Sequence, residues 1–432
     1  MVAAAAAAAG FAATLGTIGS DVLWLVPLGD RVVHGSLPSS IPYATARSGG
    51  WHDVPAGGEV IAWALFHAAG GDRGLVLAQV LAAALGFGIL ARDLRREASG
   101  AATLAVAVAV LVGSAATVAV TNAWLFALAL FPALLALVQA DARAPSRRLW
   151  LAVPLLALWG NLNGSALAGL GLLAVYLALG PARRRPVRAA AILATGAVAV
   201  CSNPALWHTP AYYRGVLGNE AARRGAGLWA PLGRSALDVP LAAAALLLVA
   251  AALRRRTFRP WEAVAVLGLA AATVHAARVG PWLLLVAAYP AARALRARAL
   301  PPRPVVLAAA VLAAGAVAAV AAGPRDPGAQ ALARLAARTG KPVLAEPVLG
   351  QQVALAGGRV WLDNPIDAFP LADQRLYLDW TAGDASGAAT VAHAGLVLVR
   401  AGSAAGRRAR ADRRLAVVAA RDGAVLYEVR RR

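Results

Sequence analysis

Three carboxylates near the N-terminus are the first candidates for chemistry. Asp21 directly follows the first apolar segment, and Asp53 and Glu59 lie further along the same loop. A carboxylate can act as a general base or hold a divalent metal, so these three are the candidate catalytic residues, and a divalent metal is the one cofactor they suggest. Asp21 could instead only cap the helix that starts beside it, and Asp53 and Glu59 could be solvated loop residues.

Arginine and histidine side chains in the loops could bind a phosphate group, because guanidinium pairs with two phosphate oxygens at once. Arg278, with His275 three residues before it, lies between two apolar segments and is the best placed for a lipid-linked phosphate. The alternative for these cations is contact with lipid headgroups. The other cationic candidates are Arg31, Arg47, Arg214, Arg223, Arg224 and His208.

The element WGNLNG places two amides, Asn161 and Asn163, at the mouth of two apolar segments. Amides there could bind sugar hydroxyls or tie the two helices together. The sequence contains no glycine-rich phosphate loop and no nucleophile elbow. This absence argues against a nucleotide-driven pump.

The composition indicates an integral membrane protein. Hydrophobic residues make up 60% of the 432 residues and charged residues only 15%, whereas soluble domains carry about 25% charged residues. The net charge of +21 comes almost entirely from short arginine clusters between apolar runs. This pattern is typical of membrane loops and forms no continuous basic face, which argues against nucleic-acid binding. Cys201 is the only cysteine, so no disulfide framework is expected.

A membrane span needs about 20 apolar residues, and the chain contains about eleven such segments. Arginine clusters follow every second span, which places the N-terminus in the cytoplasm and the tail outside. The predicted spans are 2–19, 74–91, 101–120, 123–140, 149–160, 165–180, 189–202, 237–253, 261–276, 280–292 and 304–322. The clusters are Arg92, Arg95 and Arg96; Arg143, Arg147 and Arg148; Arg183, Arg184, Arg185 and Arg188; Arg254, Arg255, Arg256 and Arg259; and Arg293, Arg296, Arg298 and Arg303.

Two domains are expected: a transmembrane helical bundle over 1–322, and a small soluble α/β domain over 323–432 outside the membrane. The bundle carries two long outer loops, 20–73 and 203–236, and a short apolar segment at 59–69 that we expect to be interfacial or re-entrant. In the tail, ALARLAARTG predicts a helix. KPVLAEP, GRVWLDN, AGLVLVR, RLAVVAARDG and AVLYEVR predict strands, the last two forming a hairpin at Asp422-Gly423.

This order of parts resembles the GT-C membrane glycosyltransferases, in particular a bacterial branch with a D-x-D-L-W-W-H-L opening, W-x-N-L-H-G and L-N-P-x-G elements and a late R-N-I-P-L-F-like element. GRVWLDN resembles that branch's strand ending in Asp. The sequence departs from the branch at Gly19, Leu25, Ile41, Val54 and Pro55, which removes several acidic positions. The matching residues are Asp21, Trp24, Gly29, His34, Gly35, Pro38, Pro42, Tyr43, Trp51, Asp53, Glu59, WGNLNG, Ser202-Asn203-Pro204 and HAARVGPWLLL with Arg278.

The resemblance implies transfer of a sugar from a polyprenyl-phosphate donor to an acceptor on the outer face of a bacterial plasma membrane. It assigns the catalytic role to the three carboxylates. The substrate-binding residues are Trp24, His34, Asn161, Asn163, Arg214, Arg223, Arg224, His275 and Arg278. The alternative is a catalytically degenerate protein of the same fold that binds or transports a lipid-linked substrate. A secondary transporter is disfavoured, because the predicted spans contain almost no charged residues and no obvious repeat.

Overall fold

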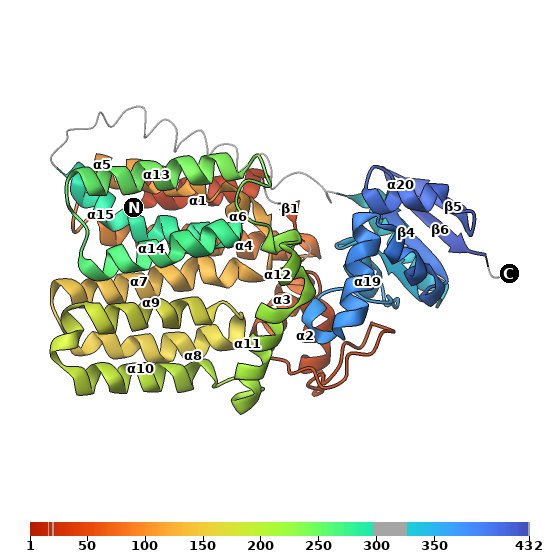
Figure 1. The fold of residues 1–432 in the computed structure, drawn as a ribbon, viewed down its shortest axis with the longest axis horizontal. Coiled ribbons are helices and arrows are strands. Elements are labelled where there is room, and N and C mark those ends of the chain that lie inside the picture. The colour runs from red at the N-terminus through yellow and green to blue at the C-terminus, as the bar shows by residue number, and fades with distance from the viewer. Residues whose placement is uncertain (16, 20, 297–325, 431–432) are drawn as a thin grey trace. The chain divides into compact units, whose positions relative to one another are not determined.

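The computed structural model describes all residues except 16, 20, 297–325 and 431–432, and its fold is mainly helical (Figure 1). The chain divides into two compact units. Unit 1 comprises Met1–Thr17, Gly74–Leu206 and Gly225–Ala322; unit 2 comprises Ile18–Arg73, Trp207–Arg224 and Gly323–Arg432. The sequence-based boundary at residue 322 placed the segments 18–73 and 207–224 with the bundle, whereas their contacts group them with the tail.

Unit 1 is a helical bundle, and each predicted span within the described residues contains a helix. Among the described residues, two helical segments, Asp72–Leu94 and Ala123–Arg143, are long and apolar enough to cross a membrane. The predicted span 304–322 lies outside the described residues, so the number of spans stays a prediction. The elements are α1 (Val2–Leu15), β1 (Thr17–Ile18), α4 (Asp72–Leu94), α5 (Gly100–Gly113), α6 (Ala115–Ala119), β2 (Val120–Thr121), α7 (Ala127–Arg143), α8 (Ala152–Leu162), α9 (Ala166–Leu179), α10 (Pro186–Val200), α13 (Asp238–Arg254), α14 (Pro260–His275) and α15 (Gly280–Leu295).

Glycine lets helices of unit 1 approach at the backbone. A Cβ added at Gly86 of α4 would lie 1.9 Å from the Leu128 carbonyl oxygen of α7, and one at Gly160 of α8 would lie 2.6 Å from that of Val200 in α10. Small residues at helix contacts are what membrane bundles use for close packing. The outer faces of α13 and α14 stay apolar, with Leu246 71% and Leu267 70% exposed. An apolar outer surface of this kind suits lipid better than water.

The arginine clusters of unit 1 meet at one end of the bundle. Arg143, the last residue of α7, contacts Asp93 at 2.7 Å and Glu97 at 2.9 Å, and Arg293 of α15 contacts Glu97 at 2.6 Å and also Glu262. These acids are buried and lie near span ends. Asp93 and Glu97 lie in the loop between the predicted spans 74–91 and 101–120, and Glu262 lies at the start of the predicted span 261–276. Their contacts join loops that the sequence assigned to one side of the membrane.

Unit 2 begins with two short helices, α2 (Leu25–Val33) and α3 (Ala56–Ala68), which cross where glycine replaces a side chain. A Cβ at Gly29 would lie 2.2 Å from the Glu59 carbonyl oxygen, so the sequence requires glycine there. The predicted short apolar segment at 59–69 corresponds to α3. The second long loop supplies α11 (Thr209–Gly218) and α12 (Glu220–Arg224).

The tail forms a four-stranded sheet in the order β3-β4-β6-β5, with β3 parallel to β4 and the other pairs antiparallel. The predicted hairpin at Asp422-Gly423 is confirmed, both residues having the positive φ that a tight two-residue turn requires. Four of the five predicted strands are present. The elements are α17 (Pro327–Arg338), β3 (Val343–Ala345), α18 (Leu349–Leu355), α19 (Leu371–Ala382), β4 (Leu396–Arg400), α20 (Ala404–Ala411), β5 (Leu415–Arg421) and β6 (Ala424–Val429).

The prediction of a strand at GRVWLDN is wrong. Val360 makes only isolated bridges, one to Val343 and one to Ala44. The pairing between this segment and β3 does not extend into a strand. The segment is short, because the turn at Gly357-Gly358 precedes it and Pro365, which has no N–H to donate, follows it. The segment instead links the first long loop to the tail, with Val360 donating to the Tyr43 carbonyl and Thr45 donating to that of Val360.

Candidate functional site

Asp53 and Glu59 form a buried acid pair in unit 2. Asp53 is 3% exposed and Glu59 is fully buried. No N–H or hydroxyl donor of the described residues reaches their four carboxyl oxygens, so each carboxyl has the other as its polar neighbour. Burial raises the pKa of Asp53 to about 6. Burial also raises the pKa of Glu59 well above its usual value, and the negative charge of Asp53 adds to the effect. Two acids in this arrangement share one proton.

Asp21 lies at the start of the turn that leads into α2 and is only partly buried. Its carboxylate accepts a hydrogen bond from the indole Nε1 of Trp24 at 3.3 Å, one helical turn further along the chain. Trp24 was predicted to bind substrate; its ring is buried and holds Asp21 in place. Asp21 is therefore more accessible to a substrate than the buried pair.

Two residues from distant segments complete the site, and the sequence analysis did not select either. Tyr212 comes from α11, and Asp367 comes from a short 3-10 helix, Ile366–Ala368, in the tail. Burial raises the pKa of Tyr212 well above its usual value, and the nearby charges of Asp367, Asp21 and Asp53 add to this. Burial raises the pKa of Asp367 to about 6, with Asp21 contributing.

The site is therefore an acid-rich cluster built from the first long loop, the second long loop and the tail. Tyr43 connects it to the tail, because its hydroxyl donates to the Asn364 carbonyl at 2.7 Å. The signals that could have identified the two missed residues were the tyrosine pair in PAYYR and the NPID that directly follows GRVWLD. Neither signal has the spacing of a catalytic motif.

Asp53→Asn should stabilise the protein at pH 7.5 or leave its stability unchanged. Because the pKa of Asp53 rises from 3.8 to about 6 on folding, the native state binds more protons between these pH values. The carboxyl therefore destabilises the fold above about pH 6, and the amide lacks this penalty. Unfolding temperatures of both proteins between pH 5 and 8 would measure the difference. A variant clearly less stable than the parent across this range would contradict this account, because it would mean that a cation or a hydrogen-bond donor stabilises the ionised Asp53 carboxylate.

A cavity of about 520 Å³ lies in unit 2 beside the cluster, with Tyr43 in its wall. Trp63 and His67 also line it, their rings 4.7 Å apart. Asp30 accepts a hydrogen bond from the Trp63 indole at 3.1 Å, and Arg31 and Arg359 add positive charge. Aromatic faces with a few polar groups are typical of small-molecule sites.

The other predicted residues of unit 2 lie mostly on its surface. His34 is exposed at the end of α2, and its Nδ1 lies 2.7 Å from the Asp30 carbonyl oxygen. His208 stacks on His52, with ring centroids 4.1 Å apart. Arg214 and Arg223 are exposed.

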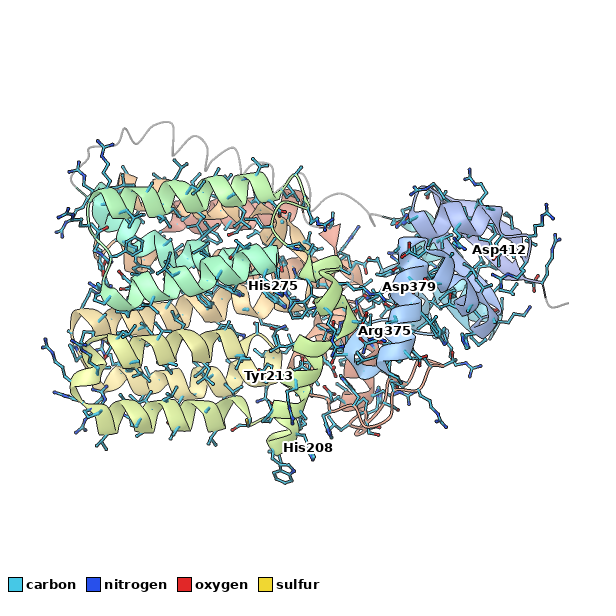
Figure 2. The ribbon with its side chains drawn as sticks, viewed as in Figure 1. His208, Tyr213, His275, Arg375, Asp379 and Asp412 are labelled. Atoms are coloured by element: carbon cyan, nitrogen blue, oxygen red, sulfur yellow. The ribbon has the colours of Figure 1, made fainter. Side chains whose placement is uncertain are left out.

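Arg224 is already neutralised by two carboxylates. It contacts Glu220 at 2.9 Å and Asp379 of α19, while Arg375 of the same helix contacts Glu220 at 3.2 Å. Figure 2 shows Arg375 and Asp379 on this helix. The arrangement ties α12 to α19 and satisfies the Arg224 guanidinium within the protein.

In unit 1, Arg278 lies against two tryptophan rings. Its guanidinium carbon is 3.5 Å from the ring centre of Trp229 and 4.8 Å from that of Trp124. Trp124 stacks in turn on Trp282 of α15, 5.7 Å away. Stacked rings hold a guanidinium by cation–π attraction. His275, at the end of α14, is exposed.

Both amides of WGNLNG bind backbone groups. Asn161 donates to the carbonyls of Ala157 and Ser202. Asn163 is buried, donates to the Ala123 carbonyl at 2.7 Å and accepts from the Ser165 N–H at 2.7 Å. These bonds connect α8 to neighbouring segments, which is the helix-tying role considered from the sequence.

Within the described part of the chain, no three His, Cys, Asp or Glu side chains are grouped as a metal site would require. The divalent metal that the sequence suggested therefore has no assigned ligand set.

No family model matches this sequence, and no curated protein matches it. A solved structure does: the crystal structure of ArnT from Cupriavidus metallidurans bound to undecaprenyl phosphate. It aligns with a TM-score of 0.58 over 99% of this chain and 96% of that chain, at 13% sequence identity. At this identity the likeness establishes a shared fold. The resemblance predicted from the sequence is thus confirmed for the fold, and it extends over nearly the full length of both proteins.

Proposed function

We propose that this protein transfers a sugar from a polyprenyl-phosphate donor to an acceptor at the outer face of the plasma membrane. The observation that carries the proposal is the meeting of Asp21, Asp53 and Glu59 with Tyr212 and Asp367 in one acid-rich cluster. These side chains come from three distant segments. Packing alone gives no reason to gather so many acids, because each buried charge costs free energy.

Asp21 is the general base in this proposal, because it is partly exposed whereas Asp53 and Glu59 are buried. It takes the proton of an acceptor hydroxyl as that oxygen forms a bond to the anomeric carbon of the sugar. The bond from the anomeric carbon to the phosphate oxygen breaks, and its electron pair leaves with polyprenyl phosphate. The buried pair keeps the surroundings negative, which favours a proton on Asp21 as the reaction proceeds.

The lipid carrier is supported by the ArnT structure, which is bound to undecaprenyl phosphate. In this chain, Arg278 would bind the donor phosphate, whose negative charge grows as the sugar leaves. The adjoining tryptophans keep the guanidinium in place.

Arg278→Gln should weaken binding of a polyprenyl phosphate by about 10-fold or more, because a hydrogen bond to a charged group contributes about 1.5–3 kcal/mol. Expression and folding should be unaffected. Titration of the purified protein with a fluorescent polyprenyl phosphate measures the effect. Exposed Arg255→Gln, which removes the same charge from another loop of unit 1, is the matched control. Equal affinity in the parent and Arg278→Gln would assign this arginine to headgroup contact.

The proposed location is a bacterial inner membrane, with the N-terminus in the cytoplasm and the tail outside. The meeting of Arg143, Arg293 and their acid partners at one end of the bundle supports this orientation. A phosphatase fused after Arg432 should be active, and an inactive fusion would reverse the orientation of the tail.

Incubating the purified protein with a panel of polyprenyl-phosphate sugars tests the function. We expect one donor to lose its sugar in the presence of an acceptor lipid extract, and a parallel reaction with EDTA tests the divalent metal. The second candidate, a binding protein of the same fold, is favoured by the motif residues lost at Gly19, Ile41, Val54 and Pro55, three of which are acids in the branch it resembles. It would bind polyprenyl phosphate without transferring sugar from any donor.

A further inference from the structure

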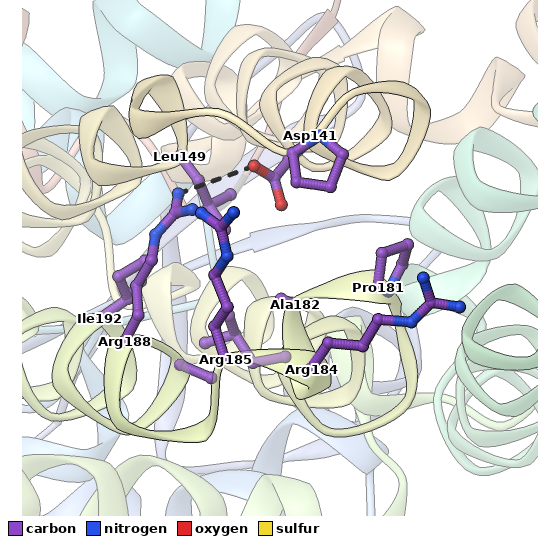
Figure 3. Close-up of a pocket in the computed structure, with 11 residues that line it drawn as sticks. Asp141, Leu149, Pro181, Ala182, Arg184, Arg185, Arg188 and Ile192 are labelled. Atoms are coloured by element: carbon purple, nitrogen blue, oxygen red, sulfur yellow. Dashed lines mark ion pairs between the residues drawn. The ribbon is translucent and has the colours of Figure 1, made fainter.

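A second polar cavity lies in unit 1, where the turn between α7 and α8 meets the turn between α9 and α10. It has a volume of about 190 Å³. Figure 3 shows Arg184, Arg185 and Arg188 around it, with Asp141 facing Arg188 and Ile192 in its wall. One water occupies roughly 30 Å³ of liquid, so the space admits a group of phosphate size.

Asp141 is already fully engaged by the protein. It accepts hydrogen bonds from the Tyr176 hydroxyl at 2.7 Å and the Ser146 N–H at 2.8 Å, and it lies 3.7 Å from Arg188. Arg188 also donates to the Ser146 carbonyl. These bonds fasten α7, α9 and α10 together, so Asp141 serves the fold.

The cavity nevertheless keeps unused positive charge. The Nε of Arg188 is buried without a hydrogen-bond partner among the described residues. The side chains of Arg184 and Arg185 line the cavity and form no hydrogen bond or ion pair with any described residue. With three guanidiniums against one carboxylate, the cavity is cationic. The first turn of α10 lies beside it and adds the positive end of the helix dipole.

We propose that this cavity binds the phosphate group of an anionic phospholipid. Basic pockets between membrane helices on the cytoplasmic side are suited to such headgroups. A lipid fits better than free phosphate because Leu177 and Ile192 line the cavity, and Val187 next to it is 84% exposed. The inference rests on the membrane placement proposed above and is independent of sugar transfer.

Calorimetric titration of the detergent-solubilised full-length protein tests the site, with short-chain phosphatidylglycerol, phosphatidylcholine and inorganic phosphate as three separate probes. Phosphatidylglycerol should bind more tightly than the other two. The double variant Arg184→Gln/Arg185→Gln should weaken it by about 10-fold or more. Arg188 is left intact because it also holds Asp141.

The matched control is Arg254→Gln/Arg255→Gln, which removes the same charge from exposed positions of another arginine cluster and should bind as the parent does. Circular dichroism and unfolding temperature establish that both variants are folded. Equal weakening in the two double variants would overturn the site in favour of diffuse attraction. Inorganic phosphate binding as tightly as the lipid would overturn the lipid as its ligand. Sugar transfer by any variant has no bearing on either result.

Discussion

Asp21→Asn should lower the kcat of sugar transfer by about 10²–10⁴-fold, which is the usual effect of removing a positioned acid or base. The substitution keeps an oxygen that can accept the hydrogen bond from Trp24, so the turn before α2 is preserved and the unfolding temperature should change little. What is removed is the ability to take the acceptor proton. Steady-state kinetics on the donor identified by the panel measures the loss.

The matched control is Asp384→Asn, which removes an exposed carboxylate from the same unit and should leave kcat unchanged. Donor binding by Asp21→Asn should also be close to that of the parent, so that the loss is in kcat and not in KM. Full activity in Asp21→Asn would move the role of base to Asp53, whose pKa of about 6 also suits a base near neutral pH.

Glu97→Gln should destabilise the protein by about 3–5 kcal/mol, the cost of breaking a buried ion pair by removing one partner. Glu97 is 6% exposed and lies 2.9 Å from Arg143, 2.6 Å from Arg293 and 3.6 Å from Arg259. Without the negative charge of Glu97, the three guanidinium groups repel one another with fewer carboxylates nearby to offset their positive charge. Chemical unfolding in detergent measures the difference.

The direction of the pKa shift of Glu97 predicts how the stability difference between parent and variant changes with pH. Burial alone would raise the pKa of Glu97, but hydrogen bonds from Arg293 and Arg143 outweigh it and lower the pKa. The stability from the carboxylate is therefore fully present above its unfolded pKa of about 4.3. It is lost as the pH falls through the lower pKa of the folded state. The difference in free energy of unfolding between parent and variant should be largest at pH 7 and should decrease below about pH 4.

Glu428→Gln is the control for Glu97→Gln. Glu428 pairs with Lys341 in an exposed ion pair, and solvent screens such pairs strongly. Its loss should leave the unfolding temperature nearly unchanged. A comparable loss of stability in both variants would show that the ion pairs of Glu97 stabilise the protein no more than an exposed ion pair does.

The helices of unit 1 could be predicted from the sequence because apolar runs between arginine clusters are a local signal. The hairpin at Asp422-Gly423 could be predicted for the same reason, since the turn residues themselves determine it. The bridge made by Val360 could not, because its partners include Ala44, more than three hundred residues away. A pattern along the chain carries no information about such a partner.

The candidate site shows the same limit. The sequence identified Asp53 and Glu59 as separate loop acids, while their burial together depends on α3 packing against Gly29 of α2. Tyr212 and Asp367 join them only through tertiary packing. Conversely, Arg224 looked like a free cation in the sequence, and Glu220 and Asp379 neutralise it.

The measurement that tests the central claim most directly is release of polyprenyl phosphate from a radiolabelled polyprenyl-phosphate sugar by purified protein, parent and Asp21→Asn side by side. We predict acceptor-dependent release by the parent and a loss of about 10²–10⁴-fold in the variant. If the parent binds the donor but releases no polyprenyl phosphate from any sugar tested, this protein is not a glycosyltransferase and its fold serves binding instead.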